Sequence, residues 1–85
     1  MPLIARLDDP GTHPGKITTA ASRSYAEGKK IARVGDTFSC EEHGPNPITT
    51  GAQRSKCEGP LIAFHGSQTQ CGASIIATAT RTKVE

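Results

Sequence analysis

The chain has 85 residues with a formal net charge of +2, and hydrophobic residues make up 34% of it. A chain of this length forms a thin core, and such small domains usually gain further stability from a metal, from disulfides or from a partner. Ten basic and eight acidic residues are scattered along the sequence, so the dense basic face of a nucleic-acid-binding protein is not expected. We expect residues 1–85 to form a single domain.

Short strands separated by turns are predicted along the whole chain. No window has the apolar spacing of an amphipathic helix, whereas short runs rich in Ile, Val and Thr recur between Gly and Pro residues. In chain order, these runs are 16–22, 29–34, 47–53, 60–66 and 73–84. The pairs Glu27-Gly28 and Glu58-Gly59 are predicted at hairpin tips, because Gly tolerates a positive φ. The pattern indicates an all-β fold made of short hairpins.

The sequence also repeats itself. Ile17–Asp36 aligns with Ile48–Ser67 without a gap, and more than half of the aligned positions are identical. Partial copies at the two ends, Leu3–Asp9 and Ile75–Thr82, bring the number of units close to three. A period of about 30 residues indicates one supersecondary unit that is used repeatedly. We therefore expect three hairpin units around a pseudo-threefold axis.

Neither a signal peptide nor a membrane span is expected. Arg6 follows the N-terminus before an apolar run can form, and no apolar stretch approaches the roughly 20 residues that a membrane span needs. We therefore expect synthesis in the cytoplasm. The three cysteines are an odd number, which argues against a complete disulfide framework and, in a reducing compartment, favours metal binding.

Candidate metal ligands occupy the same place in each unit. His13 precedes Ile17 by four residues, whereas His43 precedes Ile48 and Cys71 precedes Ile76 by five. If the units pack around a common axis, these three side chains converge on it. A structural zinc site takes four Cys or His ligands in a tetrahedron. The sequence therefore predicts one zinc ion near the axis.

The fourth ligand has two candidates. His65 stands where Leu7 and Val34 stand in the other units, and we expect those positions to face inward. Cys40 is the alternative, because its Cys-x-x-His spacing with His43 suits a local chelate. We prefer His65, so that the predicted metal ligands are His13, His43, His65 and Cys71.

Simpler interpretations exist for each of these residues. Taken singly, the histidines could be loop, turn or core residues and Cys71 a small buried hydrophobe. A disulfide between Cys40 and Cys71 is a rival if the protein works outside the cytoplasm. Cys57 lies at a hairpin tip, where the other unit has Ala26, and is assigned no role.

A catalytic metal is not favoured. Glu41 and Glu42 are acidic neighbours that a minimal metal hydrolase would use, but a filled shell of four ligands leaves no place for a reacting water. Asp9 and Asp36 fall at equivalent positions of the repeat, for which we expect a turn or cap role.

These features resemble those of the PAAR-repeat proteins, named after a Pro-Ala-Ala-Arg signature. Lys30-Ile31-Ala32-Arg33 stands in place of that signature, and the loops at 8–17, 35–48 and 68–76 are similar to the family's loops in order and spacing. The resemblance covers residues 3 to about 82. It implies a small cone of β-hairpins, with zinc near the apex, that is the structural tip of a type VI secretion spike and not an enzyme.

The resemblance also implies partners. The broad base would sit on a trimeric VgrG-type spike, one chain per trimer, and the chain would be a monomer on its own. The tip would sharpen the spike for membrane puncture and carry separate effector proteins, without binding nucleic acid or inserting stably into membranes. It would be cytoplasmic when assembled and then delivered with the spike into target cells. The alternatives are the tip of a phage or other contractile tail, or a small zinc-binding protein-interaction module.

Overall fold

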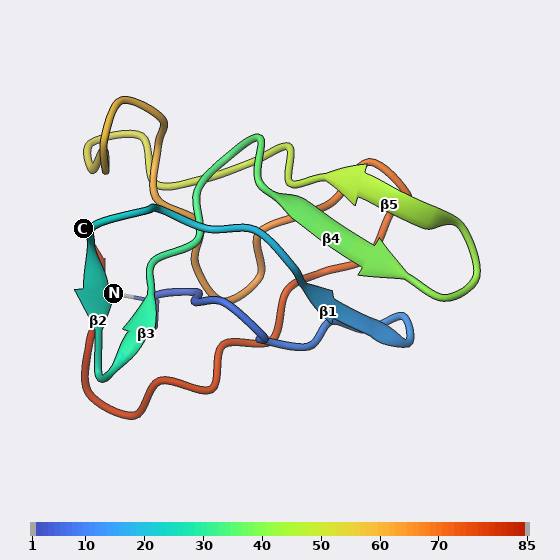
Figure 1. Ribbon diagram of the computed structural model, residues 1–85, viewed down its shortest axis with the longest axis horizontal. Helices are drawn as coiled ribbons and strands as arrows, with labels where there is room; N and C mark the ends of the chain where they lie inside the picture. The colour runs from blue at the N-terminus through green and yellow to red at the C-terminus, as the bar shows by residue number, and fades with distance from the viewer. Residues whose placement is uncertain (1, 85) are drawn as a thin grey trace.

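The computed structural model describes residues 2–84, which fold entirely from short strands, single bridges and turns (Figure 1). Three antiparallel strands form one sheet in the order β1-β4-β5, and two form a hairpin, β2-β3. The strands are β1 (Gly15–Ile17), β2 (Tyr25–Ala26), β3 (Lys29–Lys30), β4 (Thr37–Cys40) and β5 (Gly44–Pro47). The predicted all-β fold is confirmed. No helix that could span a membrane is found within residues 2–84.

A closed ring of three backbone hydrogen bonds lies at the centre of the molecule. The amide of Ala5 donates to the carbonyl of Ala63, that of Ala63 to Ala32, and that of Ala32 back to Ala5, each at 3.0 Å. These alanines occupy the same position in the three sequence units, and all are fully buried. Only a side chain as small as alanine leaves room for three backbones to approach one axis this closely. The ring confirms the expected pseudo-threefold arrangement.

The same equivalence corrects the alignment of the third unit. The amides of Asp8, Gly35 and Gly66 donate to the carbonyls of Ile17, Ile48 and Ile75, respectively. Ile75 is therefore the partner of Ile17 and Ile48, and Cys71 precedes it by four residues, as His13 precedes Ile17. The counting from Ile76 was wrong by one residue because the third unit has a second isoleucine at this point.

The expected turn role of Asp9 and Asp36 is also confirmed. Their carboxylates accept hydrogen bonds from the backbone amides of Arg6 and Arg33, each at 2.8 Å. In the third unit Ser67 does the same with its hydroxyl, which accepts from the amide of Phe64 at 2.9 Å. Each unit thus closes its turn with a side-chain oxygen, which is the usual use of Asp and Ser in such turns.

The hydrophobic core has two parts along the axis. One surrounds the alanine ring and continues toward β4 and β5, with Phe38 and Ile17 among its largest members. The other lies toward β2 and includes Ile4, Ala26 and Val84. Most of the buried hydrophobic side chains are alanines or isoleucines. The core is therefore thin, as expected for a chain of this size.

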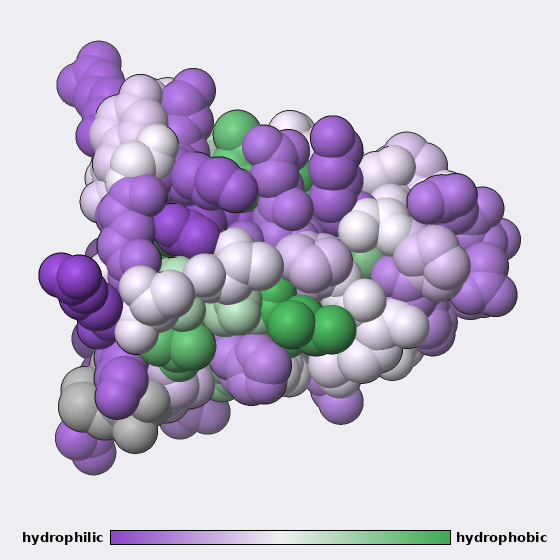
Figure 2. All heavy atoms as spheres, turned by 90° about the horizontal axis from the view of Figure 1, so that it is seen from below, coloured by the Kyte–Doolittle hydropathy of each residue, from purple (hydrophilic) through white to green (hydrophobic). Residues whose placement is uncertain are grey.

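The molecule is broad at one end and narrow at the other, as Figure 2 shows, with extents of 30 × 24 × 22 Å. We call the broad end, which carries β2 and β3, the base, and the narrow end, where β4 turns into β5, the apex (Figure 1). The bridge between Leu3 and Lys83 keeps both ends of the described chain at the base. Figure 2 also shows polar side chains over both ends and apolar ones gathered between them.

Two hairpin tips at the base carry the predicted Glu-Gly pairs. Both residues of each pair have positive φ: 49° and 86° for Glu27 and Gly28, and 54° and 110° for Glu58 and Gly59. This geometry matches the twist of short antiparallel strands. It also fixes the direction in which each glutamate side chain leaves the tip.

Each of these glutamates binds a turn of a neighbouring unit. The carboxylate of Glu27 accepts hydrogen bonds from the backbone amides of Thr80, Arg81 and Thr82 and from the Thr80 hydroxyl, at 2.8–3.1 Å. That of Glu58 accepts four from Ser22–Ser24, at 2.9–3.3 Å. We call these two contacts the carboxylate clamps. They join units that are distant in the sequence.

Candidate metal centre at the apex

Four potential metal ligands meet at the apex. His13 lies in the turn before β1, and Cys40 is the last residue of β4. His43 lies in the turn between β4 and β5, and Cys71 lies in the turn that the bridge between Gln68 and Ser74 closes. The ligand atoms of His13, Cys40, His43 and Cys71 all lie within 4.8 Å of one another. The three units therefore contribute one, two and one residue to a single cluster.

The closest distances in the cluster join sulfur to ring nitrogen. The Sγ atom of Cys40 is 3.4 Å from Nδ1 of His43 and 3.7 Å from Nδ1 of His13. The Sγ atom of Cys71 is 3.6 Å from Nδ1 of His13. The two imidazole rings lie with their centroids 5.3 Å apart and tilted by 33°. Both histidines thus direct Nδ1 toward the thiols.

Strand pairing explains how the first two units meet. In the register of β1 with β4, Gly15 lies opposite Cys40, which places the turn containing His13 beside that cysteine. Gly15 has a φ of 147°, and a Cβ atom there would lie 1.9 Å from the carbonyl oxygen of Ser39. Only glycine permits this close approach of the two backbones. The position of His13 therefore depends on Gly15.

The third unit is held to the cluster by side-chain amide contacts. The Oδ1 atom of Asn46, on β5, accepts a hydrogen bond from the backbone amide of Cys71 at 3.2 Å. Its Nδ2 atom donates to the carbonyl of Gly44 at 3.0 Å. Asn46 thus fixes the turn of Cys71 relative to the hairpin that carries Cys40 and His43.

The surroundings of Cys71 favour its thiolate. The Thr69 hydroxyl lies 3.1 Å from Sγ, and its hydrogen bond, helped by the backbone amide of Ala73 and by His13 and Cys40, lowers the pKa of Cys71 to about 6. A thiolate is the form in which cysteine binds metals. Cys40 is fully buried, His43 is exposed, and the other two side chains of the cluster are half-buried.

The structure brings together three of the four residues expected from the sequence, and Cys40 takes the fourth place instead of His65. His65 lies outside the cluster and is exposed, and its Nδ1 accepts a hydrogen bond from the backbone amide of Ala77 at 3.1 Å. The expectation that its position faces inward was wrong: the equivalent Leu7 and Val34 are only half-buried, and His65 is exposed. The Cys-x-x-His spacing with His43 was the signal that identified Cys40.

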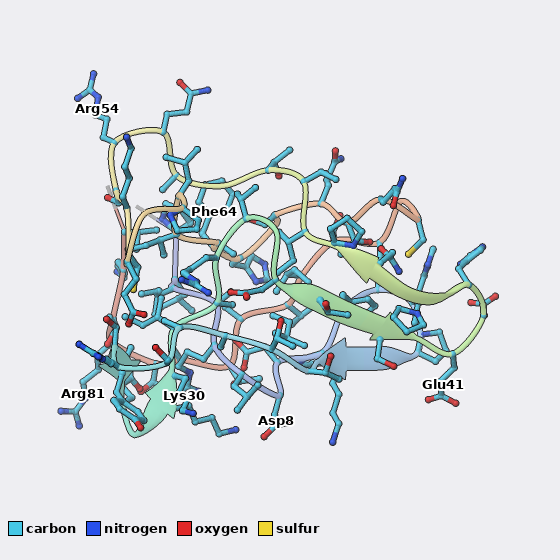
Figure 3. The ribbon with its side chains drawn as sticks, turned by 45° about the horizontal axis from the view of Figure 1, so that its top comes forward. Asp8, Lys30, Glu41, Arg54, Phe64 and Arg81 are labelled. Atoms are coloured by element: carbon cyan, nitrogen blue, oxygen red, sulfur yellow. The ribbon has the colours of Figure 1, made fainter. Side chains whose placement is uncertain are left out.

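The acidic residues Glu41 and Glu42 and the third cysteine, Cys57, are not part of the cluster. Glu41 and Glu42 are exposed in the apical turn, and Figure 3 shows Glu41 directed outward from it. Cys57 is buried at the base, at the opposite end of the molecule from the cluster. The equivalent residues of the other two units are Ala26 and Val84, which are also buried. All three cysteines are free thiols.

The family model of the PAAR motif matches residues 7–77. That range includes all four residues of the apical cluster. No curated protein matches the chain.

Proposed function

Because the chain belongs to the PAAR-motif family, we propose that it is the tip of a type VI secretion spike, stabilised at its apex by one zinc ion. The PAAR motif is associated with spike-tip proteins, and the family is structural and not enzymatic. The observation that carries the proposal is the convergence of four ligands from three pseudo-symmetric units at the narrow end. The chain that surrounds this cluster has the tapered shape that a tip requires (Figure 2).

The donor set and its spacing fit zinc. Bonds of about 2.3 Å to sulfur and about 2.0 Å to nitrogen give a tetrahedron with a sulfur–nitrogen edge of about 3.5 Å. The three short sulfur–nitrogen distances at the apex are 3.4, 3.6 and 3.7 Å. Two thiols with two imidazoles are a common structural zinc set, and hard cations such as Mg²⁺ and Ca²⁺ prefer oxygen ligands. We therefore assign zinc to His13, Cys40, His43 and Cys71.

The function of the metal would be mechanical. An apex has little interior volume, and the side chains around this cluster leave it partly exposed. Coordination bonds can contribute about 10 kcal/mol of apparent folding free energy where a hydrophobic core cannot form. In this proposal, zinc joins the three units at the point that meets the target membrane first.

The base would bind the spike. Three equivalent units around one axis present three equivalent surfaces at the broad end, which suits a trimeric VgrG-type β-helix with one chain per trimer. The chain would be a monomer before assembly in the cytoplasm, and it would leave the cell with the spike. The tip would also carry effector proteins. The same surfaces would suit the tip of a phage or other contractile tail.

Two measurements test this proposal. Elemental analysis of the purified protein should find one zinc per chain, and native mass spectrometry with VgrG-type trimers should find one chain per trimer. A metal-free protein of unchanged stability would contradict the zinc assignment. Three chains per trimer would contradict axial capping, because each chain would then bind one subunit.

A further inference from the structure

Three arginines occupy equivalent positions at the base. Arg23, Arg54 and Arg81 each precede a residue whose carbonyl accepts a backbone hydrogen bond from the equivalent isoleucine of the same unit: Ser24 from Ile31, Ser55 from Ile62 and Thr82 from Ile4, at 2.8–2.9 Å. All three arginine side chains are exposed. The pseudo-threefold axis therefore relates three guanidinium groups at the broad end.

The carboxylate clamps leave two of these guanidinium groups available. Glu58 and Glu27 contact the backbone amides of Arg23 and Arg81, at 2.9 Å in each case, and not their guanidinium groups. Within residues 2–84 neither Arg23 nor Arg81 forms an ion pair. The clamps fix the backbone from which Arg23 and Arg81 project, and Figure 3 shows Arg54 and Arg81 extending away from the body of the molecule.

The charges of the two ends have opposite signs. The arginines share the base with further exposed lysines, Lys29, Lys56 and Lys83, and the described acidic residues there are the two clamp glutamates. The apical turn instead carries Glu41 and Glu42, both exposed. A net charge of +2 for the whole chain thus conceals a cationic base and an acidic apex.

We propose that the base recognises acidic groups on a threefold-symmetric protein surface, with Arg23, Arg54 and Arg81 each meeting a carboxylate of a different subunit. The inference rests on the proposed function, and it adds the chemistry by which the partner is selected. Three arginines related by an axis match a trimer, in which one carboxylate occurs three times at the same radius. Phosphates of a duplex or of a lipid surface do not have this arrangement, and the single tyrosine gives the base little means of stacking on bases.

Arginine suits this role because its planar guanidinium group binds a carboxylate through two parallel hydrogen bonds. Exposed charges at the rim of an interface mainly control the rate of association and the choice of partner. The partner should therefore be selected by charge before the surfaces close. A trimer with basic residues at the corresponding radius should be rejected.

The experiment uses the chain of residues 1–85 and the VgrG-type trimer found to bind it in the stoichiometry measurement. Affinity is measured by biolayer interferometry for Arg23→Ala, Arg81→Ala and the triple Arg→Glu variant of residues 23, 54 and 81. Each alanine variant should bind about two- to fivefold more weakly, as for exposed ion pairs, and the triple variant at least about tenfold more weakly. Raising the salt concentration should weaken binding of the wild type more than that of the triple variant.

Lys16→Ala is the matched control, because Lys16 is an exposed cation on the flank that pairs with Asp8 at 3.7 Å. It should leave the affinity unchanged. Zinc content and the melting temperature are recorded for every variant, so that a folding defect is not mistaken for a binding defect.

The outcomes separate the two proposals. Similar losses for Arg23→Ala and Arg81→Ala support the threefold recognition. If the wild type binds the trimer and the arginine variants bind equally well, the inference is overturned and the spike-tip function stands. Tighter binding to duplex DNA or to phosphatidylglycerol vesicles than to any trimer overturns both.

Discussion

The apex and the base join the three units by different chemistry. At both ends three chain segments must be joined where little apolar surface can be buried. At the apex, four side chains from three units converge within 4.8 Å of one another, so one cation can join all of them. At the base, the units are joined in pairs by carboxylates that accept backbone and hydroxyl hydrogen bonds. At the apex a single cation can therefore join all three units, whereas at the base several separate hydrogen-bonded contacts are needed to join them.

The difference follows from the geometry of the cone. Near the axis, side chains of different units reach one point, whereas at the broad end they are too far apart for that. A central metal should make the apex strong but dependent on a single ion. Separate clamps should make the base weaker but tolerant of the loss of any one contact. Four variants test this difference between the two ends.

Replacing Cys40 should have the largest effect. In Cys40→Ser the buried thiol is lost from the proposed zinc site, and the free energy of unfolding should fall by several kcal/mol together with the metal content. Thermal unfolding and elemental analysis of the same sample measure both. His65→Ala is the control, because His65 lies outside the cluster, and it should keep one zinc per chain. Loss of zinc from His65→Ala and not from Cys40→Ser would refute the assignment of the ligands.

Gly15→Ala should have the second largest effect. The added Cβ would lie 1.9 Å from the Ser39 carbonyl oxygen, so β1 must move away from β4 and take His13 with it. We expect a loss of about 2–4 kcal/mol of stability and a weaker affinity for zinc, measured by chemical unfolding and by competition with a chromophoric chelator. Gly28→Ala is the control, because Gly28 is a tip glycine at the base with no atom near its Cβ position. Its strain should lower stability without changing the affinity for zinc.

The clamps should give the base a dependence on pH. Hydrogen bonds hold the pKa of Glu27 well below its usual range, first those from the amides of Thr80 and Arg81, and the amide of Arg23 is the first cause that lowers the pKa of Glu58. Because both pKa values are lowered on folding, the stabilisation is complete above pH 4.5, the ordinary value, and is lost as the pH falls toward the folded values.

The double variant Glu27→Gln with Glu58→Gln tests this pH dependence. It should be less stable than the wild type at pH 7, by less than Cys40→Ser, and the difference between the two proteins should shrink below pH 4.5. Thermal unfolding is compared from pH 3 to pH 7, and because the two proteins share the same apical ligands, protonation of those ligands cancels in the difference between them. A difference in stability that grows as the pH falls would contradict the stabilising role of the two ionised glutamates.

Much of the fold could be predicted because the repeat is visible in the sequence. The alignment of Ile17–Asp36 with Ile48–Ser67 identified the unit and its hairpin tips, and the loops that precede the equivalent strands identified three residues of the apical cluster. The repeat could not identify the fourth residue of the cluster, because the direction of a side chain relative to the axis depends on how the units pack. His65 was preferred for a place in the repeat that turned out to be exposed, whereas Cys40 reaches the cluster through the pairing of β1 with β4.

The carboxylate clamps were missed for a related reason. Glu27 and Glu58 are identical residues at equivalent positions, so the signal was present in the alignment. Their partners, however, lie in the neighbouring unit, at Thr80–Thr82 and Ser22–Ser24, and not near them in the sequence. Contacts between units follow the cyclic order of the ring. A linear alignment shows which residues are equivalent but not which unit each one touches.

Cys57 gives the smallest expected effect and the sharpest contrast with the apex. Its thiol is buried at the base, where the equivalent residues are Ala26 and Val84, so the position requires only a small apolar side chain. Cys57→Ala should change stability by less than about 1 kcal/mol and leave the zinc content at one per chain. Cys71→Ala, which removes a thiol at the apex, should lose the metal. If Cys57→Ala lost zinc as well, the base would take part in metal binding, and the assignment of the metal to the apex alone would be contradicted.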